Sequence, residues 1–226
     1  AHGQRGGTSL RAHGTAVGLP SDDDMGNSEV GHNALGAGRI FAQGAKLVNR
    51  ALADGSLFAN PVWVQAVEHG RAHTMHFIGL HSDGNVHSNN DQLYQLLERA
   101  AQEGVRRARL HILLDGRDVP ARSALDYIAQ TEQVLQKINE HHGADFRIAS
   151  GGGRMTITMD RYGADWEMVK RGYDCHTYGI GRPFASATEA VETMYAETDL
   201  GDQYLPAFVI VDDRGPIGTM HDGDAV

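Results

Sequence analysis

The chain has 226 residues, of which 41% are hydrophobic and 22% charged, with a formal net charge of −9. This balance excludes a disordered tail or a fibre and argues against general affinity for nucleic acid or an anionic membrane. With one cysteine, Cys175, and no apolar run of roughly 18 residues, the sequence has no internal disulfide or membrane span, so we expect a cytoplasmic protein.

Hydrophobic periodicity predicts alternating helices and strands from residue 40 onwards. Residues 1–39 are rich in Gly and Asp and are expected to form a loop that leads into a helix. The predicted helices cover residues 40–52, 91–102, 123–139 and 186–197, and the predicted strands cover 76–80, 108–114, 145–150 and 208–211. This alternation is typical of an α/β fold, with a mainly parallel sheet flanked by helices.

Polar residues follow three of the predicted strands, in the segments 82–88, 115–118 and 151–154. Because the carboxyl ends of parallel strands meet at one edge, we expect these segments to converge. Arg117, Arg154 and Arg161 would then form a local anion site, since guanidinium groups bind carboxylate and phosphate oxygens at two points. Surface ion pairing is the alternative for each Arg. Their position beside Gly-rich strand ends favours a ligand site.

Ser28 lies between small residues, just before the start of a predicted helix. A serine on such a tight turn is a candidate nucleophile, provided that a base or a metal activates it. His32 is the nearest base, although one helical turn could point it away. The alternative is that Ser28 caps the helix, because Ser is preferred at that position.

The 13 histidines do not show the spacing of a metal site. The sequence has neither a His-Glu-x-x-His motif nor a cysteine pair, and the neighbours His141 and His142 would point to different sides of a helix end. The segment 36–38 has two of the three glycines of a dinucleotide-binding loop and no convincing strand before it. We therefore exclude a nicotinamide site.

Several long segments resemble the cofactor-independent phosphoglycerate mutases, in particular those of plants and trypanosomatids. The matching segments are residues 12–20, 24–39, 82–84, 86–88, 115–120, 152–155, 158–162, 165–166, 170–172, 202–206 and 222–226. The resemblance implies a two-domain enzyme of the alkaline phosphatase superfamily that interconverts 3-phosphoglycerate and 2-phosphoglycerate in glycolysis, without 2,3-bisphosphoglycerate or a nucleotide. Residues 1–42 would be a segment of the phosphatase-like domain, and residues 43–226 a phosphotransferase domain that is incomplete at its C-terminal end.

The resemblance also implies roles for individual residues. Ser28 matches the nucleophile that is phosphorylated, and it would be a ligand of one of two divalent ions, most often Mn²⁺ and in some members Mg²⁺ or Co²⁺. Asp118 would move a proton on the glycerate hydroxyls. The positions that hold the glycerate and its phosphate in this family are matched by His87, Arg117, Asp118, Arg154 and Arg161.

The sequence departs from the family pattern in length and at two positions. It matches only the middle of the enzyme, so we expect a fragment that is inactive alone, and otherwise a monomer whose partner is its small substrate. Asn85 stands where the family usually has Gly, and His81 replaces an apolar residue. Two alternatives stay open: a non-catalytic module that binds phosphosugar acids, and another phosphomutase of the superfamily.

Overall fold

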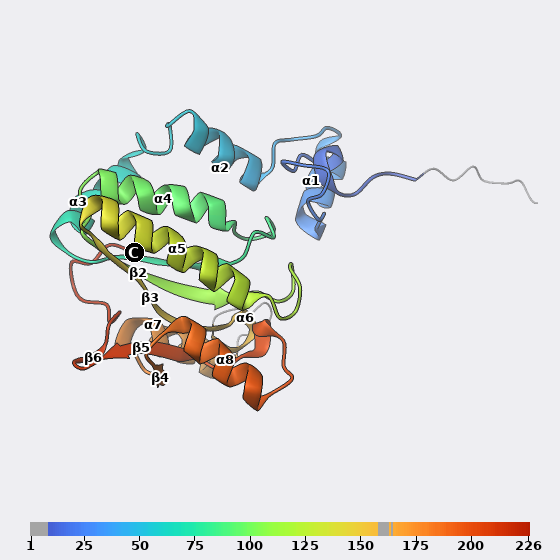
Figure 1. The fold of residues 1–226 in the computed structure, drawn as a ribbon. Helices are drawn as coiled ribbons and strands as arrows, with labels where there is room; N and C mark the ends of the chain where they lie inside the picture. The colour runs from blue at the N-terminus through green and yellow to red at the C-terminus, as the bar shows by residue number, and fades with distance from the viewer. Residues whose placement is uncertain (1–8, 158–162, 164) are drawn as a thin grey trace, which may run out of the picture.

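The computed structural model describes residues 9–157, 163 and 165–226, which form a mixed sheet with helices on both faces (Figure 1). The sheet order is β1-β2-β3-β5-β4, and β6 pairs with β5. Strands β1, β2 and β3 are parallel, whereas β5 is antiparallel to β3. The strands are β1 Met75–His81, β2 Arg107–Leu114, β3 Asp145–Gly153, β4 Arg182–Phe184, β5 Phe208–Asp212 and β6 Gly215–Pro216.

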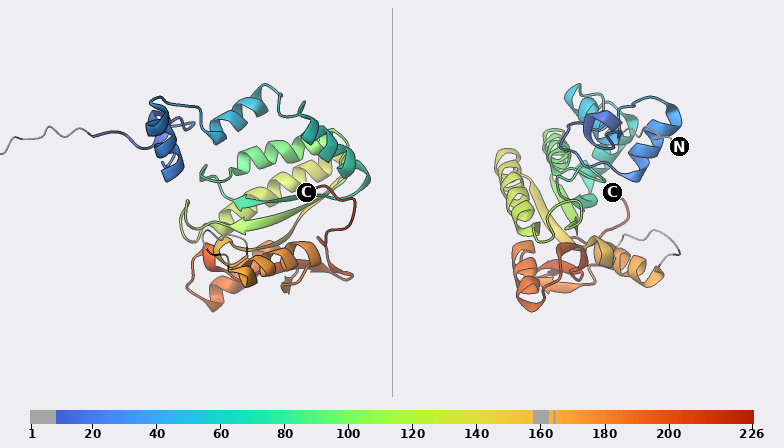
Figure 2. Two further views of the ribbon diagram at one scale, coloured as in Figure 1. Left: turned by 180° about the vertical axis from the view of Figure 1, so that it is seen from behind. Right: turned by 90° about the vertical axis from the view of Figure 1, so that its right-hand side faces the viewer.

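Helices α4 and α5 connect the three parallel strands and lie side by side on one face, next to α8, while α7 lies on the other face (Figure 2). The short helix α6 follows β3, and α3 packs against β1. The helices are α1 Ser28–Ala37, α2 Gly44–Ala53, α3 Pro61–Ala72, α4 Asn90–Gln102, α5 Ala124–His142, α6 Arg154–Ile157, α7 Trp166–Tyr178 and α8 Ala187–Glu197, with 3₁₀ turns at Gly14–Val17 and Asp202–Tyr204. In the part of the chain that the structure describes, no helix is long and apolar enough to span a bilayer.

The predicted α/β class is confirmed, with one qualification for the second half of the sheet. Strands β4 and β5 run opposite to β1–β3, so the sheet is mixed. The main core lies between the sheet and the helices, and contains Leu97, Phe146 and Phe208. The N-terminal segment has a separate small core of its own, formed by Val17, Leu19 and Val30.

Strand β3 extends through the three glycines that we expected to follow it. A Cβ atom on Gly151 would lie 2.5 Å from Cζ of Phe208, and one on Gly153 would lie 2.3 Å from the carbonyl oxygen of Gln203. Side chains therefore cannot be accommodated at these positions without displacing neighbours. The glycines allow β3 to pass close to neighbouring chain segments. Arg154 follows directly, as the first residue of α6.

The helix expected from residue 40 begins only at Gly44, so its predicted start was wrong. The amide N–H of Gln43 donates to the carbonyl of Gly18 at 2.9 Å, and its side-chain Nε2 donates to the carbonyl of Val17 at 3.0 Å. These two hydrogen bonds hold residue 43 in an extended conformation against the N-terminal segment, where tertiary pairing outweighs helical periodicity.

Three buried histidines and a serine form a continuous hydrogen-bonded row through the sheet. His76 Nε2 lies 3.2 Å from Asp224 Oδ2, and His76 Nδ1 lies 2.9 Å from His111 Nε2. Ser150 Oγ continues the row, 2.7 Å from His111 Nδ1 and 2.8 Å from His176 Nδ1. Burial lowers the pKa of His111 to about 2 and that of His176 to about 4. The row therefore consists of neutral imidazoles that tie the C-terminal segment to the sheet.

The stability of the chain should fall steeply as the pH drops from about 6.5 to about 4. Burial lowers the pKa of His81 to about 4, as it does for His176, whereas both would titrate near 6.5 when unfolded. Below pH 6.5 the unfolded chain takes up protons that the folded chain cannot bind, so each residue destabilises the fold by roughly 3 kcal/mol at pH 4. Urea unfolding at a series of pH values measures this loss.

His81→Leu is the matched variant for that pH series. Nδ1 of His81 is buried and has no hydrogen-bond partner in the part of the chain that the structure describes. Nε2 of His81 lies 2.7 Å from Oγ1 of Thr131, which also has Tyr94 as a partner. We expect His81→Leu to raise the free energy of unfolding by about 1–2 kcal/mol at pH 7. The variant should also lose less of this free energy as the pH falls to about 4. An unchanged pH slope in this variant would contradict the assignment of His81 as a neutral buried base.

Candidate functional site

The carboxyl ends of β1, β2 and β3 meet at one edge of the sheet, as the sequence predicted, and one carboxylate joins all three. Asp115 directly follows β2 and has a side chain that is 1% exposed. Its Oδ2 accepts a hydrogen bond from Oγ of Ser82, the first residue after β1, at 2.6 Å. Its Oδ1 accepts one from Nη1 of Arg154, the first residue after β3, at 2.8 Å. Sequence analysis did not single out Ser82 or Asp115, although each is the polar residue that immediately follows a strand.

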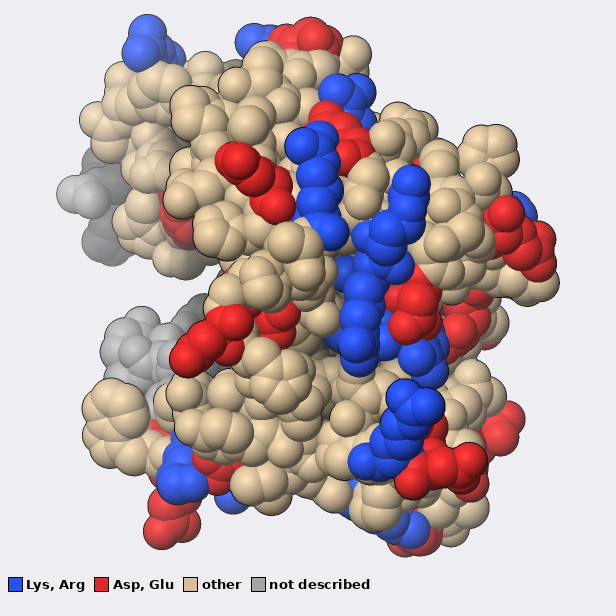
Figure 3. Space-filling view, turned by 90° about the vertical axis from the view of Figure 1, so that its left-hand side faces the viewer, with Lys and Arg blue, Asp and Glu red and all other residues tan. Residues whose placement is uncertain are grey.

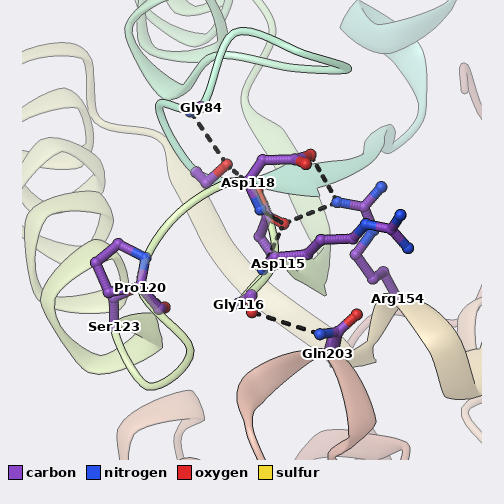
Figure 4. A network of polar contacts seen from close by, with 10 residues as sticks. Gly84, Asp115, Gly116, Asp118, Pro120, Ser123, Arg154 and Gln203 are labelled. Carbon is purple, nitrogen blue, oxygen red and sulfur yellow. Dashed lines mark hydrogen bonds and ion pairs between the residues drawn. The ribbon is translucent and has the colours of Figure 1, made fainter. Parts of the chain in front are cut away.

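Arg154 is a nearly buried cation, 4% exposed, held between two carboxylates (Figure 4). Its Nη1 lies 2.8 Å from Asp115 Oδ1 and 2.8 Å from Asp118 Oδ2. Burial alone would lower the pKa of Arg154, but the bonds to Asp118 and Asp115 raise it above the ordinary value. Nε of Arg154 is buried and has no partner among the described residues. The guanidinium is thus fixed on one side, and its buried Nε donor remains available within the described part of the chain.

The turn after β2 is shaped by the same carboxylate. The backbone N–H groups of Arg117 and Asp118 donate to Asp115 Oδ1 at 3.2 and 3.1 Å. Gly116 has φ +60°, and a Cβ atom there would lie 2.9 Å from the carbonyl oxygen of Ala121, so only glycine fits this turn without strain. Asp118 is consequently held against Arg154, whereas the Arg117 side chain is exposed.

The remaining predicted binding residues are not all brought to Arg154. His87 is exposed and lines a cleft of about 230 Å³ together with Ser88, Asn89 and strand β1. Arg161 lies outside the described residues. The structure therefore joins Asp118 and Arg154 directly and places Arg117 beside them in the same turn.

Ser28 is the first residue of α1 and is exposed, which leaves its hydroxyl accessible. The cap of this helix is Asn27, whose side-chain oxygen accepts a hydrogen bond from the N–H of Val30 at 3.0 Å. The alternative in which Ser28 is the N-cap is therefore wrong, because Asn27 already provides the oxygen. The helix start also directs positive backbone charge toward this serine.

His32 lies close to Ser28 but is not arranged as its base. Nδ1 of His32 is 3.2 Å from Oγ of Ser28 and 2.6 Å from the Ser28 carbonyl oxygen. A carbonyl only accepts, so Nδ1 carries the proton and has no lone pair left for the serine O–H. The His32 ring therefore lies within reach of Ser28, as its sequence position suggested. It cannot act as the base through Nδ1, because that nitrogen donates to the backbone carbonyl of Ser28.

A hydrogen bond between Asn85 and Asp24 links the N-terminal segment to the edge of the sheet. Nδ2 of Asn85 donates to Oδ1 of Asp24 at 2.7 Å, and Oδ1 of Asn85 accepts from Asn89 at 2.9 Å. Asn85 has φ +59°, the left-handed conformation that Asn tolerates best after Gly. Asn85 thus adopts a conformation that glycine also favours, and its side chain adds a contact to the segment that carries Ser28.

The described residues do not fit the two-metal centre that the family resemblance implies. They contain no group of three or more His, Cys, Asp or Glu side chains that could hold a metal ion. Ser28 supplies one hydroxyl, and its nearest side-chain partner is His32, whose Nδ1 is occupied. Hard divalent ions need several convergent oxygen ligands, so this part of the chain cannot form such a centre alone.

The 226-residue chain should accordingly bind Mn²⁺ only weakly and show no mutase turnover. One hydroxyl cannot hold two ions, and the histidine spacings offer no substitute cluster. Titration calorimetry with Mn²⁺ and an enolase-coupled assay on the purified chain provide the two measurements. Tight binding of two ions, or turnover that follows the chain through purification, would show that the metal site lies within these residues.

The fold is an α/β domain, and the edge at which its parallel strands end carries the buried Arg154 guanidinium between Asp115 and Asp118. A family model described as "BPG-independent PGAM N-terminus" matches residues 48–226. The chain belongs to this family, the 2,3-bisphosphoglycerate-independent phosphoglycerate mutases.

Similar proteins come from bacteria, plants and trypanosomatids. A probable 2,3-bisphosphoglycerate-independent phosphoglycerate mutase of Leptospira interrogans is 56% identical over 96% of this chain and 40% of its own length. The corresponding enzyme 1 of Arabidopsis thaliana is 54% identical over 97% of this chain and 40% of its own. A Leishmania mexicana phosphoglycerate mutase, solved at low cobalt concentration, superposes with a TM-score of 0.92 at 49% identity, over 95% of this chain and 40% of that one. The chain spans about 40% of the length of these relatives.

Proposed function

We propose that this chain is part of a mutase that interconverts 3-phosphoglycerate and 2-phosphoglycerate through a phosphoserine at Ser28. Relatives that are named for this activity support the proposal, as does the fold that the chain shares with one of them. We also propose that residues 1–42 belong to a phosphatase-like domain and residues 43–226 to the phosphotransferase domain. The separate small core of the N-terminal segment supports that division.

The observation that carries the proposal is the arrangement of Arg154. A buried guanidinium that keeps a donor without a protein partner is suited to an anionic ligand, because an unpaired buried donor is otherwise costly. A phosphate or carboxylate accepts such donors at two points. Phosphoglycerate carries both groups.

The chain's own residues have distinct tasks in this scheme. Arg154 binds and orients the phosphoglycerate, together with Arg117 and His87 near the same edge and Arg161 beyond the described residues. Asp118, held 2.8 Å from Arg154, moves a proton on the glycerate hydroxyls. Ser28 supplies the hydroxyl that accepts the phosphoryl group, and the N-terminus of α1 stabilises negative charge beside it.

Two divalent ions, with Mn²⁺ as the expected species and Mg²⁺ or Co²⁺ as the alternatives, belong to the proposal for the full-length protein. When bound, they would supply Lewis-acid chemistry and orient the phosphoryl group. Because the described residues do not form their site, we derive no step through them. The full-length protein is further proposed to be a cytoplasmic monomer that needs neither 2,3-bisphosphoglycerate nor a nucleotide.

A non-catalytic phosphosugar-acid binding module is the second candidate function. The observation in its favour is that the described residues contain the Arg154 cluster without a metal-binding group. An enolase-coupled assay on the full-length protein, with and without 2,3-bisphosphoglycerate, separates the candidates. The mutase proposal predicts equal turnover in both conditions. Phosphoglycerate binding without turnover would favour the binding module, and turnover of other phosphosugars alone would favour a different phosphomutase.

A further inference from the structure

We propose that Asp115 is the positioning residue of the substrate site, which acts by fixing Arg154 and the turn that carries Asp118. This inference rests on the proposed function, because it concerns the residue that orients the Arg154 guanidinium toward the substrate. Asp115 is not itself expected to touch the substrate. All four of its described hydrogen bonds are directed to protein groups that border the site.

Asp115 follows β2 and its carboxylate hydrogen-bonds to the residues that follow β1 and β3, so it links all three strand ends. Oδ2 holds Ser82 after β1, and Oδ1 holds Arg154 after β3. The same Oδ1 accepts from the backbone of Arg117 and Asp118, so the position of the Asp118 carboxylate depends on it. Figure 4 shows the Arg154 side chain approaching Asp115 and Asp118 together.

Asp115 occupies Nη1 of Arg154 and leaves Nε free of protein partners among the described residues. A long guanidinium side chain that is not anchored would sample several rotamers and lose entropy when it binds an anion. The buried Asp115 carboxylate, bonded to Nη1, holds the Arg154 guanidinium in one orientation before the ligand binds. Burial would raise the pKa of Asp115, but the bonds from Ser82, Asp118, Arg154 and Arg117 lower it, which keeps an ionised acceptor in place.

The opposite edge of the sheet provides an Arg–Asp pair for comparison. There Asp145, at the start of β3, accepts from Nη2 of the buried Arg109 at 2.6 Å and also pairs with Arg147. Figure 3 shows this side of the molecule, where basic side chains gather in a band with acidic side chains beside them. Every nitrogen of the Arg109 guanidinium, including Nε, donates to a protein acceptor, so this pair has the character of a structural contact, in contrast to Arg154.

The test follows the arginine Nε–H resonances of the 226-residue chain by NMR, with and without 3-phosphoglycerate. In the parent chain, we expect the Arg154 resonance to be sharp and to shift on addition of 3-phosphoglycerate. Asp115→Ala should broaden this resonance even without ligand and weaken binding at least about tenfold. Asp115→Asn should restore both, because an amide oxygen can still accept from Arg154 while the amide nitrogen donates to Ser82 Oγ.

Asp145→Ala is the matched control, since it removes a carboxylate from a buried Arg on the same sheet. It should lower Tm without changing the Arg154 resonance or the affinity for 3-phosphoglycerate. Should Asp115→Ala fail to fold, Ser82→Ala tests the same anchor, and we expect smaller broadening of the Arg154 signal.

The outcomes separate this inference from the function on which it rests. A sharp, unshifted Arg154 resonance in ligand-free Asp115→Ala, or in Ser82→Ala if the former is unfolded, would overturn the positioning role. Equal loss of affinity in Asp145→Ala would do so as well, because it would mean that the effect is general destabilisation. If the parent resonance does not respond to 3-phosphoglycerate, Arg154 does not bind the substrate, and the proposed function fails first.

Discussion

Ser28→Ala in the full-length protein is expected to abolish phosphoenzyme formation and mutase turnover while leaving Tm almost unchanged. The hydroxyl is the proposed attacking group, and alanine has no atom that could accept the phosphoryl group. Ser28 is exposed and its hydroxyl hydrogen-bonds to the exposed surface residue His32 of the same helix, so we expect its loss to remove little core packing. An enolase-coupled assay and a thermal melt measure the two effects.

Asn27→Ala is the control for the stability of α1. It removes the oxygen that caps the helix and should cost about 1 kcal/mol of folding free energy, a loss that Ser28→Ala should not show. Wild-type rates in Ser28→Ala would contradict the nucleophile assignment. A Tm loss in Ser28→Ala as large as that in Asn27→Ala would instead indicate a structural role for the hydroxyl.

Arg154→Ala is expected to lower kcat/KM for 3-phosphoglycerate by roughly 30- to 4000-fold, which corresponds to ~2–5 kcal/mol for a desolvated charged contact. Part of this loss is the cost of leaving Asp115 and Asp118 without their cation. Arg154→Lys should recover only part of the lost kcat/KM, because an ammonium group cannot donate two parallel hydrogen bonds as a guanidinium does. The same loss is expected for Arg161→Ala, on the basis of the family resemblance.

Arg106→Ala serves as the comparison for Arg154→Ala. Arg106 is exposed just before β2, at the opposite edge of the sheet, and its side chain donates to the carbonyl of Ala101 at 3.3 Å. Its removal should leave the steady-state kinetics unchanged. Equal kinetics in Arg154→Ala and the parent would make Arg154 a structural ion-pair partner rather than a binding residue.

The elements with clear periodicity were predictable, and those defined by tertiary contacts were not. Helix α5 and strands β1 and β2 have long apolar patterns and were found within a few residues of their ends. Helix α3 was missed although Asn60 and Pro61 form a helix start, because the residues that follow lack a clear apolar stripe. Strand β4 has three residues, Arg182–Phe184, and becomes a strand only by pairing with β5.

Part of the candidate site was also predictable from residue types at strand ends. The rule that parallel strands end at one edge correctly placed Arg154 with the turn that contains Arg117 and Asp118. It could not identify Asp115 as the shared acceptor, because that depends on side-chain directions. The contact between Asn85 and Asp24 joins residues that are 61 positions apart, and no local pattern predicts it.

Phosphopeptide mapping tests the central claim most directly. The full-length protein would be quenched during turnover of 3-phosphoglycerate, without 2,3-bisphosphoglycerate, and digested with trypsin. Cleavage after Arg11 and Arg39 releases residues 12–39, whose hydroxyl side chains are Thr15, Ser21 and Ser28, so fragmentation must locate the phosphate. We predict phosphate on Ser28 alone. Turnover with no phosphate on this peptide, or with phosphate on Thr15 or Ser21, would contradict the account.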